Sequence, residues 1–281
     1  MSAILYRGYD KAGLDREYDN RTKVPGFDFA GFLRECEEQS ERARTVHDCV
    51  LDVPYGDSPA ERLDIFRTSK PGPPVHVFFH GGYWRMLDKK DFSYIANGLV
   101  PHDVTVVVVN YALIPTVGMD ELIAQCRRSL RWVAENIAAY GGDPNRISIS
   151  GHSAGGHIVA MMLASEWQPP LIKHACAISG IFELEPIQLC FLNEILDLQP
   201  GVVARNSPRF LSRKTWCPFT VAVGDREGDE YLRQSNEFGV IWNDASNPVN
   251  VAVLSDEDHF SIRAQYGNPD SDIVALALGL R

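Results

Sequence analysis

The segment GHSAG at residues 151–155 places one hydroxyl, that of Ser153, between two glycines. It matches the G-x-S-x-G pattern of a nucleophile elbow, in which a strand turns sharply into a helix and exposes the serine. The strand-like run ISIS precedes the segment, and the apolar run IVAMMLAS follows it. Glycines suit both flanking positions because a side chain would collide in so tight a turn. We therefore predict that Ser153 is a catalytic nucleophile.

A serine hydroxyl needs a base to take its proton and an acid to orient that base. On a sheet with this elbow, the acid and then a histidine follow the serine along the chain, each beyond a later strand. Of the eight histidines, only His259 lies several strands downstream of Ser153 and directly after a strand-like run, VAVL. A polar loop residue is the alternative interpretation. We predict that His259 is the base.

The predicted acid lies in the loop after the preceding strand, FTVAVG (219–224), which offers four carboxylates. Asp229 and Glu230 begin a predicted helix, where acidic side chains interact favourably with the helix dipole. Asp225 and Glu227 remain as candidates. Loop position alone slightly favours Asp225, and both stay open on this ground.

A second glycine turn, HGGYW at residues 80–84, ends the apolar strand VHVFF. Glycines there let the backbone approach a substrate oxygen, so we predict that the N–H groups of Gly81, Gly82 and Ala154 form an oxyanion hole. A plain glycine loop is the alternative.

The residues after these glycines are candidates for binding substrate. Tyr83 and Trp84 are predicted to line the pocket, although packing beneath the turn explains Trp84 equally well. Arg85 could meet a substrate carboxylate, but an exposed loop arginine is the commoner case, and Arg85 is not assigned a role.

The order of the strands and helices that must position these residues predicts an α/β architecture. Residues 49–56 and 61–68 alternate apolar and polar side chains around a GDSPA turn, which predicts an antiparallel hairpin. Strand-like runs then alternate with helical segments, among them 119–139 and 229–242. This order predicts a mostly parallel central sheet with helices on both faces.

We expect one domain over residues 1–281, because no repeat or linker interrupts the alternation. Two stretches fit the alternation least well: the helical, polar residues 1–45 and the mixed region 182–215. Both are candidate covers over the site that the sheet carries.

The charge and hydrophobicity of the sequence limit the classes of molecule that the protein is expected to bind. A net charge of −10 argues against nucleic acid or an anionic membrane as the main partner. No apolar run approaches the roughly 18 residues of a membrane span, and charges occur too early for a signal peptide, so a cytoplasmic protein is expected. The expected partner is a small-molecule substrate, and a homodimer stays open.

No cofactor or metal is expected. The six cysteines show no CxxC spacing and are predicted to be reduced and mostly buried. His76 and His80 would stand about 13 Å apart on one strand face, too far to share a zinc ion.

Taken together, the motifs resemble the kynurenine formamidase (arylformamidase) group of α/β-hydrolases, close to the esterase/lipase branch that shares HGG. The resemblance covers most of the chain, through HGGYW, NYALIP, YGGDPNRISISGHSAGGH, SGIFELEPI, NEIL, RNSP, EYLRQS and DHF. SGIFELEPI and RQS narrow the match, since they are not general hydrolase features.

The resemblance implies an α/β-hydrolase fold and hydrolysis of N-formylkynurenine to kynurenine and formate through an acyl-enzyme on Ser153. Counting back from RQS in the family's pattern places the acid at Glu227, with Asp225 in reserve. A carboxylesterase or amidase for other small acyl substrates would use the same groups. A binding module that has lost catalysis is a further rival, against which the complete set of groups weighs.

Overall fold

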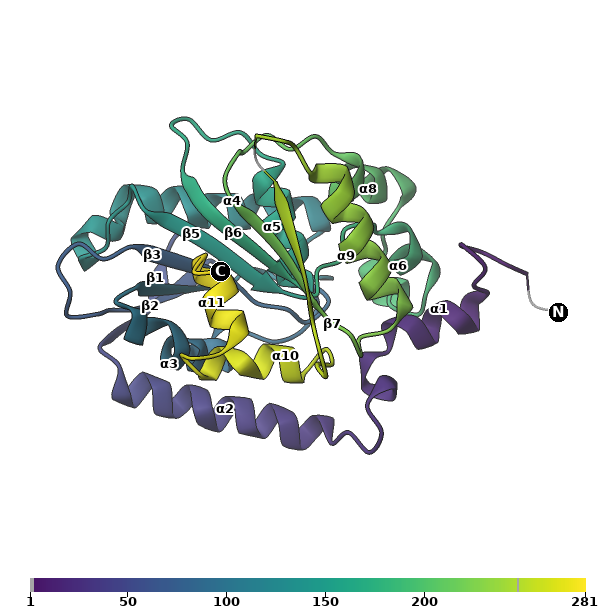
Figure 1. Ribbon diagram of the computed structural model, residues 1–281, viewed down its shortest axis with the longest axis horizontal. Helices are drawn as coiled ribbons and strands as arrows, with labels where there is room; N and C mark the ends of the chain where they lie inside the picture. The colour runs from purple at the N-terminus through teal and green to yellow at the C-terminus, as the bar shows by residue number, and fades with distance from the viewer. Residues whose placement is uncertain (1–2, 247) are drawn as a thin grey trace.

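The computed structural model describes residues 3–246 and 248–281 (Figure 1). Its centre is an eight-stranded sheet in the order β1-β2-β4-β3-β5-β6-β7-β8. The strands are β1 Cys49–Pro54, β2 Arg62–Phe66, β3 Val75–Phe79, β4 Thr105–Val109, β5 Ile147–His152, β6 Ile172–Ile178, β7 Phe219–Gly224 and β8 Val249–Leu254. β2 pairs antiparallel with both β1 and β4, and every other pairing is parallel. The predicted hairpin and mostly parallel sheet are confirmed.

Helices connect the strands and extend the chain at both ends. They are α1 Lys11–Tyr18, α2 Phe29–Val46, α3 Ala96–Leu99, α4 Met119–Asn136, α5 Ala154–Leu163, α6 Glu185–Leu189, α7 Asn193–Leu196, α8 Pro200–Arg205, α9 Asp229–Trp242, α10 Ser261–Ala264 and α11 Asp272–Leu278. The 3-10 helices are η1 Asn20–Lys23, η2 Lys89–Ile95, η3 Val100–His102, η4 Ile137–Tyr140, η5 Pro208–Phe210 and η6 Gln265–Gly267. Within the described residues, no helix is both long and apolar enough to cross a membrane.

Two apolar cores cover the two faces of the sheet, and β4 shows why its sequence is apolar throughout. Successive side chains of a strand point to opposite faces. Val107 and Val109 pack into the core that includes α4, α5 and α9, whereas Val106 and Val108 pack into the core that includes η2, α3 and α11. A strand covered on both faces has no solvent-facing position for a polar residue.

The topology brings the predicted reactive residues to one edge of the sheet. In the parallel part of a sheet, the carboxyl ends of all strands meet at the same edge, where sites form in such folds. Residues just beyond β3, β5, β7 and β8 include Gly81, Ser153, Glu227 and His259. The N-terminal α1 lies beside α6, so the beginning of the chain reaches the region 182–215 (Figure 1).

Candidate active site

Ser153 occupies a strained turn between β5 and α5. Its backbone has φ 59° and ψ −119°, a conformation that side chains with a Cβ rarely adopt. A Cβ at position 155 would collide with the carbonyl oxygen of Phe79, and one at position 151 with the carbonyl oxygen of Gly155. The two glycines therefore allow β3, β5 and α5 to approach closely enough for the turn to form.

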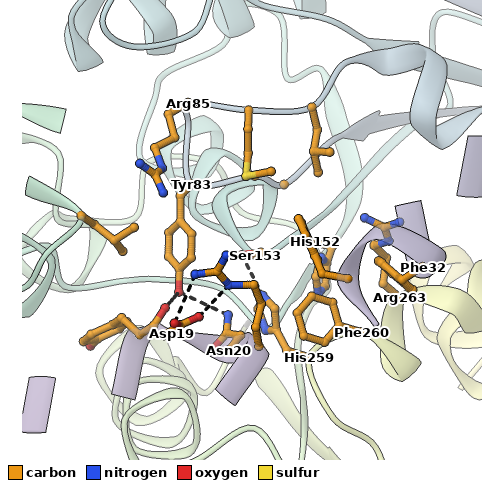
Figure 2. A pocket seen from close by; sticks show the side chains of 18 of the residues that line it. Asp19, Asn20, Phe32, Tyr83, Arg85, His152, Ser153, His259, Phe260 and Arg263 are labelled. Carbon is orange, nitrogen blue, oxygen red and sulfur yellow. Dashed lines mark hydrogen bonds and ion pairs between the residues drawn. The ribbon is translucent and has the colours of Figure 1, made fainter. Parts of the chain in front are cut away.

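His259 lies beyond β8 with its ring between Ser153 and Glu227. Its Nε2 is 3.0 Å from Ser153 Oγ, and its Nδ1 is 2.5 Å from Glu227 Oε2. Figure 2 shows the contact between Ser153 and His259 at the base of a pocket. Both side chains are buried but reach the pocket surface. The structure thus brings together a hydroxyl, an imidazole and a carboxylate in the order that proton transfer from a serine requires.

Glu227, rather than Asp225, faces the imidazole. Its side chain is fully buried, and its Oε1 accepts hydrogen bonds from Ser179 Oγ at 2.6 Å and from the Gly224 N–H at 2.7 Å. These two donors fix the carboxylate so that Oε2 points to His259. Asp225 is exposed to solvent.

The turn after β7 explains this placement. The N–H of Asp225 donates to the Leu254 carbonyl, and that of Arg226 donates to the Glu257 carbonyl, each at 3.0 Å. These bonds hold residues 225 and 226 along the chain that leaves β8. The backbone then turns, and the third residue of the loop points its side chain back into the protein.

Burial sets the protonation states of the pair. It raises the pKa of Glu227 to about 6, although hydrogen bonds from Ser179 and Gly224 oppose the rise. Burial also lowers the pKa of His259, and the positive charges of Lys23 and Arg263 lower it further. At neutral pH the imidazole is therefore uncharged and the carboxylate ionised, the state in which His259 can accept a proton.

The HGG turn lies directly against the elbow. A Cβ on Gly81 would stand 3.2 Å from Ser153 Cβ and 2.9 Å from the carbonyl oxygen of His152. Among the described residues, the N–H groups of Gly81 and Gly82 form no backbone hydrogen bond. The Ala154 N–H belongs to the first turn of α5, where helical N–H groups have no partner within the helix. These three donors are available to an oxygen beside Ser153.

The pocket above Ser153 has a volume of about 230 Å³. The N-terminal residues 18–21, 29, 32 and 33 line it, together with the HGG turn and the start of α10. Two residues of the region 182–215, Phe191 and Leu192, also contribute. Apolar side chains dominate the lining: Phe29, Phe32, Leu33, Met86, Leu87, Phe191, Leu192 and Phe260.

Tyr83 lines this pocket and fastens the N-terminal segment to it. Its hydroxyl donates to the Tyr18 carbonyl at 2.7 Å, accepts from Asn20 Nδ2 at 3.2 Å and lies 2.8 Å from the Tyr231 hydroxyl. Asn20 Nδ2 also donates to the Tyr231 hydroxyl at 3.1 Å. The ring of Tyr231 in turn packs 4.8 Å from that of His259, centroid to centroid.

Trp84 has a different environment from Tyr83. It is fully buried, does not line the pocket and donates its indole N–H to His157 Nδ1 at 3.2 Å. His157 Nε2 lies 2.8 Å from the Asn206 carbonyl oxygen. The structure therefore places Trp84 beneath the turn, in the packing position that the sequence left as an equal alternative.

Other polar residues at the site were not assigned from the sequence. Ser179 directly follows β6, a position that could have suggested a role at this edge of the sheet. Lys23 Nζ donates to the Glu227 carbonyl at 2.7 Å, and Arg263 lines the pocket, yet neither lies in a recognisable motif. Within residues 3–246 and 248–281, no group of three or more His, Cys, Asp or Glu side chains is arranged to hold a metal ion.

Comparisons with known proteins show which family this chain resembles. The BD-FAE family model matches residues 63–177. The kynurenine formamidase of Danio rerio is 38% identical over 237 residues, covering 80% of this chain and 80% of that protein. The kynurenine formamidase of Salmo salar is 33% identical over 86% of this chain and 85% of its own length.

A solved structure extends the likeness over the whole fold. A proposed thioesterase from Silicibacter sp. TM1040 superposes with a TM-score of 0.82 at 26% identity, covering 94% of this chain and 98% of that one. The fold is that of an α/β-hydrolase, as the resemblance implied.

Proposed function

Since this chain belongs to the kynurenine formamidase family and is a hydrolase that acts on small acyl substrates, we propose that it hydrolyses N-formylkynurenine to kynurenine and formate. The observation that carries the proposal is the hydrogen-bonded series from Ser153 through His259 to Glu227, at the base of a pocket. Its reaction would proceed through a formyl ester on Ser153.

In the first step, Ser153 Oγ attacks the formyl carbon while His259 Nε2 takes the hydroxyl proton. The ionised Glu227 stabilises the imidazolium through the contact at Nδ1. Negative charge develops on the formyl oxygen, which accepts hydrogen bonds from the N–H groups of Gly81, Gly82 and Ala154. Each donor of this kind lowers the barrier by about 3 kcal/mol.

In the second step, the bond between carbon and nitrogen breaks and His259 donates its proton to the departing arylamine. Water then attacks the formyl ester, gives a proton to His259 and releases formate, and Ser153 regains its proton. An aryl formamide suits these groups, because the ring shares the nitrogen lone pair and weakens the amide resonance that resists attack. The formyl carbon carries a hydrogen where other acyl groups carry a carbon chain, so it presents little steric hindrance to the attack of Ser153.

The alternative function is hydrolysis of other small acyl esters or amides by the same groups. The likeness to the proposed thioesterase favours it, as does the predominantly apolar pocket lining. Selectivity resides in the pocket rather than in the catalytic groups. Parallel kcat/KM values for N-formylkynurenine, formylanthranilate and p-nitrophenyl esters separate the two. A preference of several powers of ten for the esters contradicts the formamidase proposal.

The role of Ser153 is tested with Ser153→Ala. We expect kcat for N-formylkynurenine to fall by about 10⁵-fold, because the nucleophile is lost while binding groups remain. Labelling by a fluorophosphonate probe should disappear in the same variant. Ser212→Ala, which changes an exposed serine, serves as the control and should keep both turnover and labelling. Retained turnover in Ser153→Ala would contradict the mechanism.

A further inference from the structure

The pocket is cationic although the protein as a whole is acidic. Three arginines line it, Arg21, Arg85 and Arg263, whereas Asp19 is the one carboxylate among the described lining residues. Asp19 is already bound by Arg21, with Oδ1 2.9 Å from Nε and Oδ2 3.2 Å from Nη2. Two guanidinium charges therefore face the pocket without a neutralising carboxylate, in a chain whose net charge is −10.

Of the three lining arginines, Arg85 is the one whose side chain makes no hydrogen bond or ion pair with the described residues, although the buried Nε of Arg263 also lacks a partner. The Nε of Arg85 is buried and has no hydrogen-bond partner among the described residues. A buried polar group left without a partner costs free energy, which a ligand can recover by supplying an acceptor. The Arg85 N–H donates to the Gly82 carbonyl at 3.1 Å, so its backbone is tied to the turn beside Ser153. Figure 2 shows Arg85 beside Tyr83 among the lining residues.

Arg263 differs because the protein itself holds its side chain. Its guanidinium carbon lies 4.5 Å from the ring centroid of Phe32 and 4.6 Å from that of Phe92, and Nη2 contacts Cys36 Sγ. Stacking on aromatic faces offsets part of the cost of burying the charge. These contacts hold the Arg263 charge in a fixed position, whereas no such contact holds the guanidinium of Arg85 among the described residues.

From this arrangement we propose that Arg85 binds a carboxylate of the substrate and that the pocket selects acyl substrates whose leaving group carries a carboxylate. A guanidinium matches a carboxylate with two parallel N–H donors. The formyl group of the proposed substrate carries no carboxylate, so the charged group belongs to the departing half. The inference rests on the proposed function, since N-formylkynurenine carries its carboxylate on the amine that leaves.

The test compares substrates that differ only in charge or nearly so. The amide pair is formylanthranilate and its neutral methyl ester, and the ester pair is acetylsalicylate and methyl acetylsalicylate. N-formylkynurenine is measured beside them. We expect wild-type kcat/KM to favour the anionic member of each pair. In Arg85→Gln the ratio of anionic to neutral kcat/KM should fall about 30-fold, as for the loss of a charged hydrogen-bonding partner.

Kinetic detail separates binding from a structural role. The loss should fall mainly on KM for the anionic substrates, because the carboxylate keeps its charge throughout the reaction and is bound equally in ground and transition states. Arg85→Lys should restore part of the ratio, since lysine keeps the charge but not the paired donors. Arg146→Gln is the matched control: Arg146 is an exposed arginine before β5, at the opposite edge of the sheet, paired with Asp143.

The outcomes separate this inference from the proposed function. An Arg85-dependent preference for acetylsalicylate, with no turnover of N-formylkynurenine, would reject the proposed function and uphold the inference. Hydrolysis of N-formylkynurenine with an unchanged ratio in Arg85→Gln would do the reverse. Equal losses on both members of a pair, or a wild type that prefers the neutral members, would overturn the inference.

Discussion

Two regions of different construction meet at Ser153. The frame consists of Gly81, Gly82, Ser153, Glu227 and His259, which follow the carboxyl ends of β3, β5, β7 and β8. The segments predicted to be the cover, called the cover below, are residues 18–33 and 191–192, which contribute to the lining of the pocket beside them. Strand register positions the frame, whereas side-chain hydrogen bonds between distant segments position the cover. The predicted catalytic groups and much of the pocket lining are therefore held in place by different kinds of contact.

The contacts of each region show the difference. In the frame, Phe79 pairs with Gly151 across β3 and β5, and Gly224 pairs with Leu254 across β7 and β8, so the strand ends have fixed offsets. In the cover, the Tyr18 hydroxyl donates to Glu230 at 2.9 Å. Lys23 of the cover donates a hydrogen bond to the carbonyl of Glu227 in the frame and so connects the two regions. A change in the cover should therefore alter binding more than chemistry, with Lys23 as a point of coupling.

The largest effect should come from the frame. Glu227→Gln removes the charge that stabilises the imidazolium and offers an amide that can hold the wrong histidine tautomer, so we expect kcat to fall by about 10³- to 10⁴-fold. Asp225→Asn alters the exposed neighbour in the same loop and should change kcat by less than about threefold. The two variants are compared by steady-state kinetics on N-formylkynurenine. Equal losses would mean that the contact at His259 Nδ1 does not carry the effect.

The second prediction concerns how activity depends on pH through the protonation of Glu227, a residue of the frame. Because burial raises the pKa of Glu227 to about 6, activity should fall about tenfold per pH unit below that value, as the carboxylate that supports His259 takes up a proton. The measurement is kcat as a function of pH. It should not change from pH 7 to 8, because Glu227 is then already ionised and His259 uncharged.

The contribution of Glu227 to the free energy of unfolding should change with pH in the opposite direction to activity over the same range. The folded protein holds the Glu227 proton more tightly than the unfolded chain, whose ordinary pKa is 4.5. The proton's contribution to the free energy of unfolding is therefore complete below about pH 4.5 and lost as pH rises through about 6, a change of about 2 kcal/mol. To isolate this contribution, the free energy of unfolding in urea is measured for wild type and Glu227→Gln at both ends of this pH range. A difference between them that does not vary with pH would contradict the raised pKa.

Sequence patterns predicted the strand-borne part of the molecule well, for a physical reason. Alternation of apolar residues, glycine turns and chain order depend on local backbone geometry, and the hairpin, the parallel strands and helix 229–242 all follow from them. The positions of Ser153 and His259 near one another follow from strand ends meeting at one edge. Their catalytic roles stay predictions.

The residue that faces His259 could not be chosen from the sequence of its own loop. Loop position slightly favoured Asp225, whereas the structure turns Glu227 toward His259. The difference arises from backbone bonds to Leu254, at the end of β8, and to Glu257, in the loop after it, and the sequence of residues 225–228 does not reveal these bonds. Only the pattern of the family's members carried that information.

The cover could not be predicted in detail, because its contacts join residues that are more than sixty positions apart in the chain. Tyr18 and Asn20 meet Tyr231, and Asp15 accepts from the Phe191 N–H. The unpaired state of Arg85 is likewise a property of the assembled pocket. Residue type alone could not distinguish it from an exposed loop arginine.

The smallest expected effect tests whether the cover is separable from the frame. Tyr83→Phe removes the hydroxyl that joins the Tyr18 carbonyl, Asn20 and Tyr231 while leaving the ring in place. We expect KM for N-formylkynurenine to rise about five- to tenfold with kcat within about threefold, since lost hydrogen bonds of this kind are worth about 1 kcal/mol each and act on the fit of the cover. Tyr140→Phe, a half-buried tyrosine that packs on Trp132, is the control and should leave both constants unchanged. If kcat instead falls as far as in Glu227→Gln, the hydroxyl network holds the reacting groups themselves, and the cover belongs to the catalytic frame.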